Sequence, residues 1–158
     1  NAIGVTMRDA LVEAFDLALA DMSIERVELS GTPGCFSTGG DVEEFGMVSD
    51  PAVAHWIRSL RLPAVRAARL AHRLHVHIDG AVVGAGIEIA AFATRITATS
   101  RSWFHLPELH YGLLPGAGGT VSIPRRIGRR RAAYMMLSAR RIPAGQALSW
   151  GLIDAIAE

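Results

Sequence analysis

Short alternating or β-branched segments, separated by longer helical ones, constrain the fold of this chain more than any other feature. Residues 74–78 alternate apolar and polar side chains, which predicts a strand. Residues 26–30 and 95–99 predict two further strands, the first from alternation and the second from β-branched content. Strands separated by helices indicate βαβ units and a mainly parallel sheet, so the sequence predicts an α/β fold.

The helical segments are identified by apolar periodicity and composition. Apolar residues recur at helical spacing from Met7 to Met22, and Thr6 followed by Asp9 is a weak variant of a capping box. Residues 50–72 are rich in Ala, Leu and Arg and are predicted to be helical, with a break before Pro63. A glycine-containing turn is predicted over 80–86, and further helices are predicted over 87–94, 129–138 and 143–150.

Length and composition indicate one globular domain spanning residues 1–158. Of the 158 residues, 50% are apolar and 20% are charged, which suits a chain that buries a core. No apolar run approaches the ~20 residues that span a bilayer, so no membrane segment is predicted. Residues 1–4 lack the basic and apolar regions of a signal peptide, and the chain is expected to be a portion of something longer.

Three counts exclude several classes of function. All sixteen basic residues are Arg, and the absence of Lys excludes a Walker A loop, a Schiff-base nucleophile and an anchored pyridoxal cofactor. The single Cys excludes an internal disulfide and a multi-cysteine zinc site, and it fits a reducing, cytoplasmic location. The net charge of +1 argues against a general nucleic-acid binder.

The first predicted strand is followed by residues 35–41, which contain two adjacent glycines. Because glycines carry no side chain, they let a ligand approach the main chain closely. The alternative is a strand-to-helix turn in which Asp41 is the N-cap. Cys35 has no basic partner nearby in sequence, so it is interpreted as a small buried hydrophobe rather than a nucleophile.

The second predicted strand leads into residues 84–88, which open a helix. Their spacing does not match a dinucleotide fingerprint, because the third glycine of GxGxxG would fall at Ile89. A helix N-terminus preceded by glycine presents unpaired N–H groups to an anion. Glu88, in the first turn, either complements the helix dipole or takes part in chemistry.

Glu108 lies before a glycine-rich run and is flanked by Leu106, Pro107 and Leu109. A glutamate in a loop is usually solvated. Burial among these apolar neighbours would instead raise its pKa and let it hold or deliver a proton near neutral pH.

Two other clusters are candidate binding sites. His75 and His77 share one face of a predicted strand, but no third ligand is recognisable, so no metal site is predicted. The arginine cluster within 125–131 is interpreted as a solvated helix face or a subunit contact, because no aromatic residues interleave with it. An acidic cofactor such as coenzyme A could also use this cluster.

The order and spacing of these segments resemble the crotonase (enoyl-CoA hydratase/isomerase) superfamily over nearly the whole chain. Each segment alone is weakly specific, whereas their succession is specific. The matching segments are residues 1–2, 35–41, 80–90, 104–108, 112–120, 123–125 and 147–154.

The resemblance implies an α/β fold with a crotonase-like ββα spiral core, mainly parallel strands and surrounding helices. The family's usual leading strands and C-terminal helices are missing from the sequence, so a single catalytic core truncated at both ends is expected. The family also implies an acyl-CoA thioester substrate, no separate cofactor or metal, no nucleic-acid or membrane partner, and a homotrimer or homohexamer.

Particular residues receive roles from the same resemblance. The backbone N–H groups of Thr38 and Ala85 match the two donors that stabilise an enolate oxyanion. Glu88 matches the glutamate that activates water, Glu108 the one that exchanges the proton at the α-carbon, and Gly116 the residue whose N–H helps hold the water. Substrate binding is predicted for Phe36, Ser37, Gly39, Asp41 and Gly84.

Both family glutamates are present, which favours hydration of a 2-enoyl-CoA to a 3-hydroxyacyl-CoA. The alternatives are isomerisation, decarboxylation or thioester hydrolysis by a related enzyme, and a non-catalytic acyl-CoA-binding subunit. Thr38 is larger than the small residue usual at its position, so a narrower pocket is expected.

Overall fold

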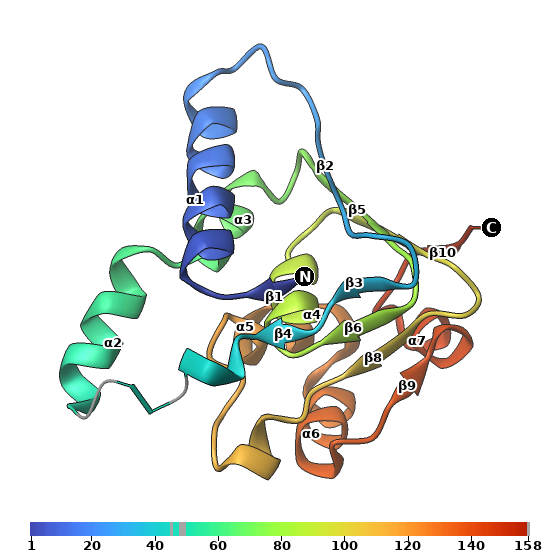
Figure 1. Ribbon diagram of the computed structural model, residues 1–158. Helices are drawn as coiled ribbons and strands as arrows, with labels where there is room; N and C mark the ends of the chain where they lie inside the picture. Colours follow the sequence, from blue (N-terminus) through green and yellow to red (C-terminus); the bar gives the residue numbers. More distant parts are fainter. Residues whose placement is uncertain (45, 48–49, 158) are drawn as a thin grey trace.

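The computed structural model describes residues 1–44, 46–47 and 50–157, and shows an α/β arrangement of sheets surrounded by helices (Figure 1). One four-stranded sheet has the order β10-β7-β5-β2 and is parallel throughout. The predicted α/β class and the three predicted strands are therefore confirmed. The strands of this sheet are β2 (Val27–Ser30), β5 (Leu74–Ile78), β7 (Arg95–Ala98) and β10 (Ala155–Ile156).

A second four-stranded sheet has the order β3-β6-β8-β9. Its first three strands are parallel, and β9 joins β8 in the antiparallel direction. A separate pair is formed by β1 (Ala2–Ile3) and β4 (Gly39–Gly40), which run parallel. The strands of the second sheet are β3 (Cys35–Ser37), β6 (Ala81–Val83), β8 (Trp103–His105) and β9 (Ile142–Pro143).

The path between the two sheets repeats three times. β2 leads into β3, β5 into β6, and β7 into β8, each through a short turn. Helices then carry the chain back: α2 and α3 return it to β5, and α4 returns it to β7. Three strands of the first sheet, β2, β5 and β7, thus each lead into a strand of the second, and β3, β6 and β8 are neighbours in that sheet.

Seven helices and two short 3-10 turns are formed by the described residues. The helices are α1 (Val5–Ala20), α2 (Pro51–Leu60), α3 (Pro63–Leu70), α4 (Ala85–Ala90), α5 (Gly119–Ile127), α6 (Arg129–Ser138) and α7 (Ala144–Trp150). The 3-10 turns are η1 (Val42–Glu44) and η2 (Glu108–Tyr111).

The helix starts agree with the sequence in one place and differ in another. Pro63 begins α3, so the predicted break before it is confirmed. Asp50 caps α2, because its Oδ1 accepts from the Ala52 N–H at 2.7 Å. The predicted start of α1 is wrong: Gly4 is the N-cap residue and makes no side-chain cap, so Thr6 lies inside the helix.

The sequence patterns did not predict the structure of two glycine-rich segments. The predicted turn over 80–86 is wrong, because Ala81–Val83 form β6 and α4 begins at Ala85. β6 pairs with β3 on one side and β8 on the other, and this pairing overrides the turn tendency of the flanking glycines. Helix α5 was not predicted, because it starts in the glycine run and contains Pro124.

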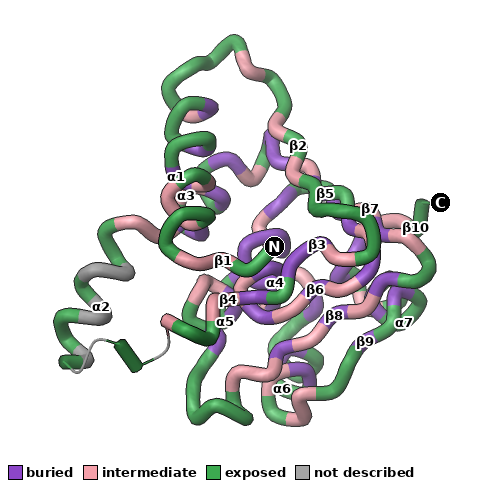
Figure 2. The backbone as a smooth tube through the Cα atoms, in the orientation of Figure 1, coloured by how far each residue is buried: buried purple, intermediate pink, exposed green. Residues whose placement is uncertain are grey.

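Helix α4 lies at the centre of the molecule, and every residue from Gly86 to Ala90 is buried (Figure 2). Its apolar residues Ile87 and Ile89 belong to the same core as Phe104 of β8 and Ile123 of α5. A helix of six residues is too short to be stable alone, so α4 is held in place by its packing. The groups carried by α4 are consequently fixed relative to both sheets.

Candidate active site

The turn from β6 into α4 depends on Gly84. This residue has φ 49°, a backbone conformation that favours glycine, and its N–H donates to the His105 carbonyl at 2.9 Å. A Cβ on Gly84 would lie 2.7 Å from Glu108 Oε1, so the absence of a side chain admits that carboxyl group. Ala85 is the first residue of α4, and its N–H therefore has no partner within the helix.

Glu88 is held by main-chain groups from a distant loop. Its side chain is buried, with 2% of the residue exposed, and Oε2 accepts from the N–H groups of Ala117 and Gly119, both at 2.8 Å. A Cβ on Gly119 would lie 2.6 Å from Glu88 Cγ, so only glycine permits this approach. Ser122 Oγ also donates to the Glu88 carbonyl at 2.7 Å. Two N–H donors stabilise negative charge on the carboxylate.

Glu108 lies in different surroundings at the start of η2. Burial raises the pKa of its carboxyl group above the ordinary value, as the apolar flanks of the sequence predicted. Oε2 is buried, and no residue that the structure describes offers it a hydrogen bond. This carboxyl group therefore keeps its proton to a higher pH than an exposed glutamate does, which suits it to proton transfer.

Thr38, the other predicted oxyanion donor, lies between β3 and β4 and is exposed. Its N–H donates to the Asn1 carbonyl over 3.4 Å, which is long for a hydrogen bond. The neighbouring Gly39 packs against β6, since a Cβ on it would lie 3.0 Å from the Val83 carbonyl oxygen. Ser37 packs against Gly86 in turn, since a Cβ on Gly86 would lie 2.6 Å from Ser37 Cβ. The structure therefore brings the segment of Thr38 against the turn that starts α4.

The residues predicted to bind substrate take several structural roles. Phe36 belongs to the hydrophobic core. Ser37 Oγ donates to the Asn1 carbonyl at 3.0 Å and accepts from the Gly39 N–H at 3.1 Å. Asp41 Oδ1 accepts from the Glu43 N–H at 3.1 Å, so Asp41 caps η1 as the alternative interpretation expected. Their contribution to substrate binding stays a prediction.

Sequence reasoning missed the two donors that hold Glu88. It selected Gly116, which is exposed and immediately precedes Ala117. The donors Ala117 and Gly119 lie in the same glycine run, whose lack of side chains lets the main chain reach a buried carboxylate. The run itself was the signal, and the position of each N–H depends on the folded loop.

Asn1 was also missed as an organiser of the Thr38 segment. Its Nδ2 donates to Thr32 Oγ1 at 3.0 Å, to the Cys35 carbonyl at 2.9 Å and to the Phe36 carbonyl at 3.2 Å. One amide group therefore joins the turn at Thr32 to the first two residues of β3. Cys35 itself is a free thiol that is half-buried, rather than buried as its interpretation as a small buried hydrophobe expected.

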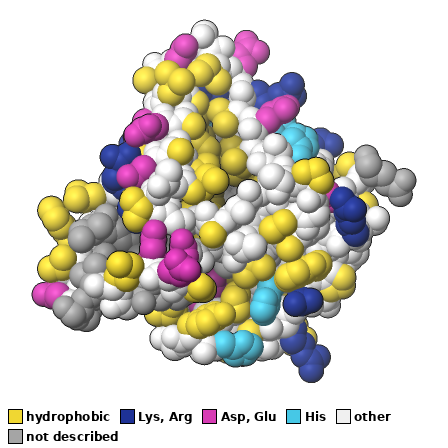
Figure 3. All heavy atoms as spheres, viewed as in Figure 1, with side chains coloured by type: hydrophobic (Ala, Val, Ile, Leu, Met, Phe, Trp, Pro, Cys, Tyr) yellow, Lys and Arg dark blue, Asp and Glu magenta, His cyan; other side chains and the backbone are white. Residues whose placement is uncertain are grey.

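An apolar hollow of about 280 Å³ lies close to these groups but contains neither glutamate. Hydrophobic side chains gather between α1 and β2 in Figure 3, where this hollow lies. It shares Ser37 and Gly86 with the segments described above. Its apolar lining is Ile3, Met7, Leu11, Leu29, Phe36 and Ile89.

The remaining candidates have structural partners. His77 Nδ1 lies 2.8 Å from Thr97 Oγ1. Within the described ranges, no three His, Cys, Asp or Glu side chains form a group suited to a metal ion. Arg126 pairs with Asp154 at 2.6 Å and donates to the Ala93 carbonyl, so part of the arginine cluster joins elements of this chain. Of the helices that the structure describes, none has the length and apolarity needed to cross a membrane.

Comparison with known proteins shows which family this site belongs to. The model of the enoyl-CoA hydratase/isomerase family matches residues 1–158. The chain belongs to this family. Its fold is shared by a structure described as a hydratase/isomerase of Mycobacterium abscessus, at TM-score 0.90 and 29% identity, covering 99% of this chain and 62% of that one. The resemblance and the crotonase fold expected from the sequence are confirmed.

The curated relatives are longer than this chain. The 2,3-dehydroadipyl-CoA hydratase of Escherichia coli is 31% identical over 162 residues, covering 98% of this chain and 60% of the relative. The glyoxysomal fatty acid β-oxidation multifunctional protein of Cucumis sativus is 30% identical over 169 residues, covering 99% of this chain and 22% of the relative. The chain therefore spans between a fifth and three fifths of the length of these two proteins.

Proposed function

We propose that this chain is the catalytic core of an enoyl-CoA hydratase, which adds water to a 2-enoyl-CoA thioester and forms a 3-hydroxyacyl-CoA. The observation that carries the proposal is the pair formed by Glu88, in α4, and Glu108, whose carboxyl group lies against Gly84, the residue before α4. Glu88 is a carboxylate whose charge is stabilised by N–H donors, and Glu108 is a carboxyl group whose pKa burial raises. Two such groups in opposite surroundings are suited to divide base and acid roles.

The thioester carbonyl would bind where the Thr38 segment meets α4. Negative charge develops on its oxygen as water adds to the β-carbon, and the N–H groups of Thr38 and Ala85 would stabilise that charge. The Ala85 N–H adds the positive end of the α4 dipole. The Thr38 N–H would exchange its long bond to the Asn1 carbonyl for a shorter one to the thioester oxygen.

The two glutamates would then act on water and on the α-carbon. Glu88, fixed by Ala117 and Gly119, would accept a proton from the attacking water, and the Gly116 N–H would help to hold that water. Glu108 would deliver its proton to the α-carbon, which completes the addition. The substrate supplies coenzyme A, so the reaction requires no separate cofactor.

Isomerisation is the second candidate, and a specific contrast favours it. Of the two glutamates, only Glu108 has a buried oxygen, Oε2, to which no residue that the structure describes offers a hydrogen bond. A carboxyl group in such surroundings is suited to proton transfer. A double-bond isomerase can move a proton between two carbons with one base. A relative from Mycosarcoma maydis, 36% identical over 124 residues, is named an enoyl-CoA isomerase/hydratase. Decarboxylation, thioester hydrolysis and non-catalytic acyl-CoA binding are the further alternatives.

Assembly and location are proposed on the family pattern. We infer a homotrimer or homohexamer that binds acyl-CoA thioesters and no nucleic acid. We also infer a cytoplasmic location, while relatives are named peroxisomal in Danio rerio and mitochondrial in Bos taurus.

The test is an assay of the full-length protein with 2-enoyl-CoA thioesters of short and medium acyl chains. Hydration is measured as the loss of absorbance of the conjugated double bond. We expect Glu108→Gln to lower kcat by about 10²- to 10⁴-fold, since Gln cannot exchange a proton. Glu88→Gln should lower hydration to a similar extent but should spare isomerisation if only one base is needed. Absence of hydration by the wild-type protein, or full activity of Glu108→Gln, would contradict the proposal.

A further inference from the structure

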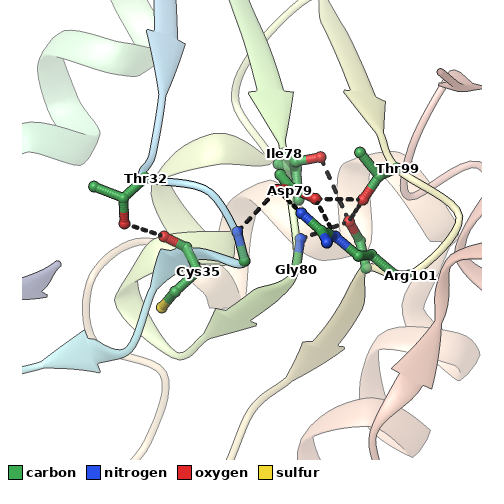
Figure 4. A network of polar contacts seen from close by, with 9 residues as sticks. Thr32, Cys35, Ile78, Asp79, Gly80, Thr99 and Arg101 are labelled. Carbon is green, nitrogen blue, oxygen red and sulfur yellow. Dashed lines mark hydrogen bonds and ion pairs between the residues drawn. The ribbon is translucent and has the colours of Figure 1, made fainter. Parts of the chain in front are cut away.

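A polar network centred on Asp79 lies at the other end of the strands that lead to the site (Figure 4). Asp79 follows β5, in the turn before β6. Its Oδ2 accepts from the Gly34 N–H at 2.8 Å, and its Oδ1 accepts from Thr99 Oγ1 at 2.8 Å. Arg101 donates through Nε to Oδ1 at 2.7 Å and pairs through NH2 with Oδ2. One carboxylate therefore joins three separate turns.

Each of these turns precedes one strand of the second sheet. Gly34 immediately precedes β3, Asp79 lies just before β6, and Thr99 lies in the turn before β8. The downstream ends of the same three strands lead to Thr38, Ala85 and Glu108. Asp79 thus joins the turns that precede the three strands leading to Thr38, Ala85 and Glu108.

Main-chain contacts around Asp79 set the alignment of β3 and β6. Gly34 donates its N–H to Asp79, and its carbonyl accepts from the Ala81 N–H at 3.2 Å. Gly80 has φ 78°, and a Cβ on it would lie 2.0 Å from the Gly34 carbonyl oxygen. The two turns are therefore in direct backbone contact, which only glycine at position 80 permits.

The turn before β8 is tied to the same point. The Gly80 N–H donates to Ser102 Oγ at 3.1 Å, and the Trp103 N–H donates to the Gly80 carbonyl at 3.2 Å. Ser102 Oγ also lies 2.9 Å from Thr99 Oγ1, which is bound to Asp79. β8 consequently takes its alignment from the residues next to Asp79.

The strands alone specify their alignment weakly. β3, β6 and β8 have three residues each, and the register of β3 against β6 shifts between Cys35 and Ser37. A slip of one residue along a strand moves the chain by about 3.3 Å. Oxyanion donors must lie within hydrogen-bond distance of one developing charge, so a displacement of this size would remove one donor.

We propose that Asp79 is a positioning residue for the reaction: it sets the register of β3 against β6, and thereby the spacing of the Thr38 and Ala85 N–H groups. The inference rests on the function proposed above. Asp79 acts through the Gly34 turn and does not touch the substrate. The hydrogen bond from the Ala81 N–H to the Gly34 carbonyl joins the two segments. Thr38 lies four residues after Gly34, and Ala85 lies four residues after Ala81, so the positions of both donors depend on this bond.

The charge of Asp79 is secured by its partners. The hydrogen bond from Arg101 holds the pKa of Asp79 well below its ordinary value, and the bonds from Gly34 and Thr99 act in the same direction. The carboxylate therefore keeps its acceptor role across the pH range in which enzymes usually work.

Asp154 provides a matched control for the experiment. Its Oδ2 accepts from the Ile96 N–H at 2.7 Å and pairs with Arg126 at 2.6 Å, so it also joins a strand to an arginine. Ile96 lies in β7, in the other sheet, which carries no proposed site residue. Asp79→Ala and Asp154→Ala should both lower the melting temperature of the full-length protein.

Only Asp79→Ala should change catalysis. We expect kcat to fall about 10- to 100-fold with little change in KM, because the donors are displaced in the transition state. Arg101→Ala leaves the Gly34 and Thr99 bonds in place and should keep kcat within about threefold. A dimethylaminocinnamoyl-CoA probe, whose absorbance moves to longer wavelength as its carbonyl is polarised, should show a smaller shift with Asp79→Ala than with Asp154→Ala.

Equal kcat for Asp79→Ala and Asp154→Ala, or an undiminished probe shift in Asp79→Ala, would overturn the inference. If Asp79→Ala does not fold, Asp79→Asn serves instead, since its amide oxygen can still accept from Gly34, and we expect a smaller fall in kcat. Wild-type protein that converts no enoyl-CoA and shifts no probe would overturn the proposed function together with this inference. An active wild type with an unaffected Asp79 variant would overturn this inference alone.

Discussion

Glu88 belongs to the buried helix α4, whereas Glu108 begins a short 3-10 turn after β8. The Glu88 carboxylate receives two N–H groups at 2.8 Å. Glu108 has one buried oxygen with no bond from any described residue, and burial raises its pKa. The same side chain is therefore held by main-chain donors in one place and left poorly solvated in the other.

This difference separates the structural from the chemical role of a buried carboxylate. Satisfied hydrogen bonds make Glu88 part of the architecture, so its removal should affect folding and chemistry together. Glu108 contributes little to the architecture, and its burial costs stability whenever it is ionised. Catalytic sites combine such groups because a proton donor must be poorly stabilised in its charged form.

Among changes that leave both glutamates in place, the largest expected effect comes from Gly119→Ala, which disturbs the surroundings of Glu88. The new Cβ would lie 2.6 Å from Glu88 Cγ and 2.9 Å from Oε2, so the carboxylate must move. We expect kcat for hydration to fall about 100-fold. The free energy of unfolding should fall by about 1–3 kcal/mol because the site becomes overpacked. Steady-state kinetics and urea unfolding measure the two effects.

Gly145→Ala is the control for a glycine-to-alanine change at the start of a helix. Gly145 lies in the first turn of α7, and a Cβ there would meet nothing within 4 Å. The variant should keep wild-type kcat and change the free energy of unfolding by less than about 1 kcal/mol, in the stabilising direction. Equal losses in the two variants would show that contact with Glu88 is not the cause.

A smaller effect should distinguish the two glutamates by stability alone. Glu88→Gln removes the charge that two N–H groups stabilise, and one unfavourable amide orientation places donor against donor. We expect it to lower the free energy of unfolding by about 1–3 kcal/mol at neutral pH. Glu108→Gln should leave that free energy unchanged or slightly raised, since no hydrogen bond to Oε2 is lost. Comparable losses in both variants, measured by urea unfolding, would remove the distinction.

Parts of this arrangement were visible in the sequence because their causes are local. Alternation predicted β5, and Pro63 marked the break between two helices, because each pattern acts within a few residues. For Glu108, the apolar neighbours predicted a raised pKa on the condition of burial, and the fold supplies that burial. The sequence thus indicated the chemistry of this glutamate, while its burial depends on the folded chain.

The surroundings of Glu88 depend on contacts between distant segments. Its donors Ala117 and Gly119 lie 29 and 31 residues further along the chain, at the N-terminal end of α5, which packs on α4. β6 was not predicted for a similar reason. Its three residues lie between glycines and form a strand only because β3 and β8 pair with them. The links through Asp79 and Asn1 likewise join turns that no local pattern relates.

The smallest expected effect concerns how the cost of burying Glu108 varies with pH. In the unfolded chain this carboxyl ionises near its ordinary value of 4.5, whereas in the folded protein burial raises its pKa. The stability that Glu108 contributes is therefore complete below the unfolded value and is lost as pH rises through the folded pKa. Glu108→Gln removes this loss, so the free energy of unfolding of the variant, relative to that of the wild type, should rise between pH 4 and pH 8. Because the group is only partly buried, we expect a relative gain of less than about 1 kcal/mol.

Urea unfolding of both proteins at the two pH values measures this gain, with the exposed Glu25→Gln as the control that should show no such gain. A gain that is absent, or that shrinks toward pH 8, would mean that Glu108 is stabilised as an anion in the folded protein, and the contrast with Glu88 would disappear.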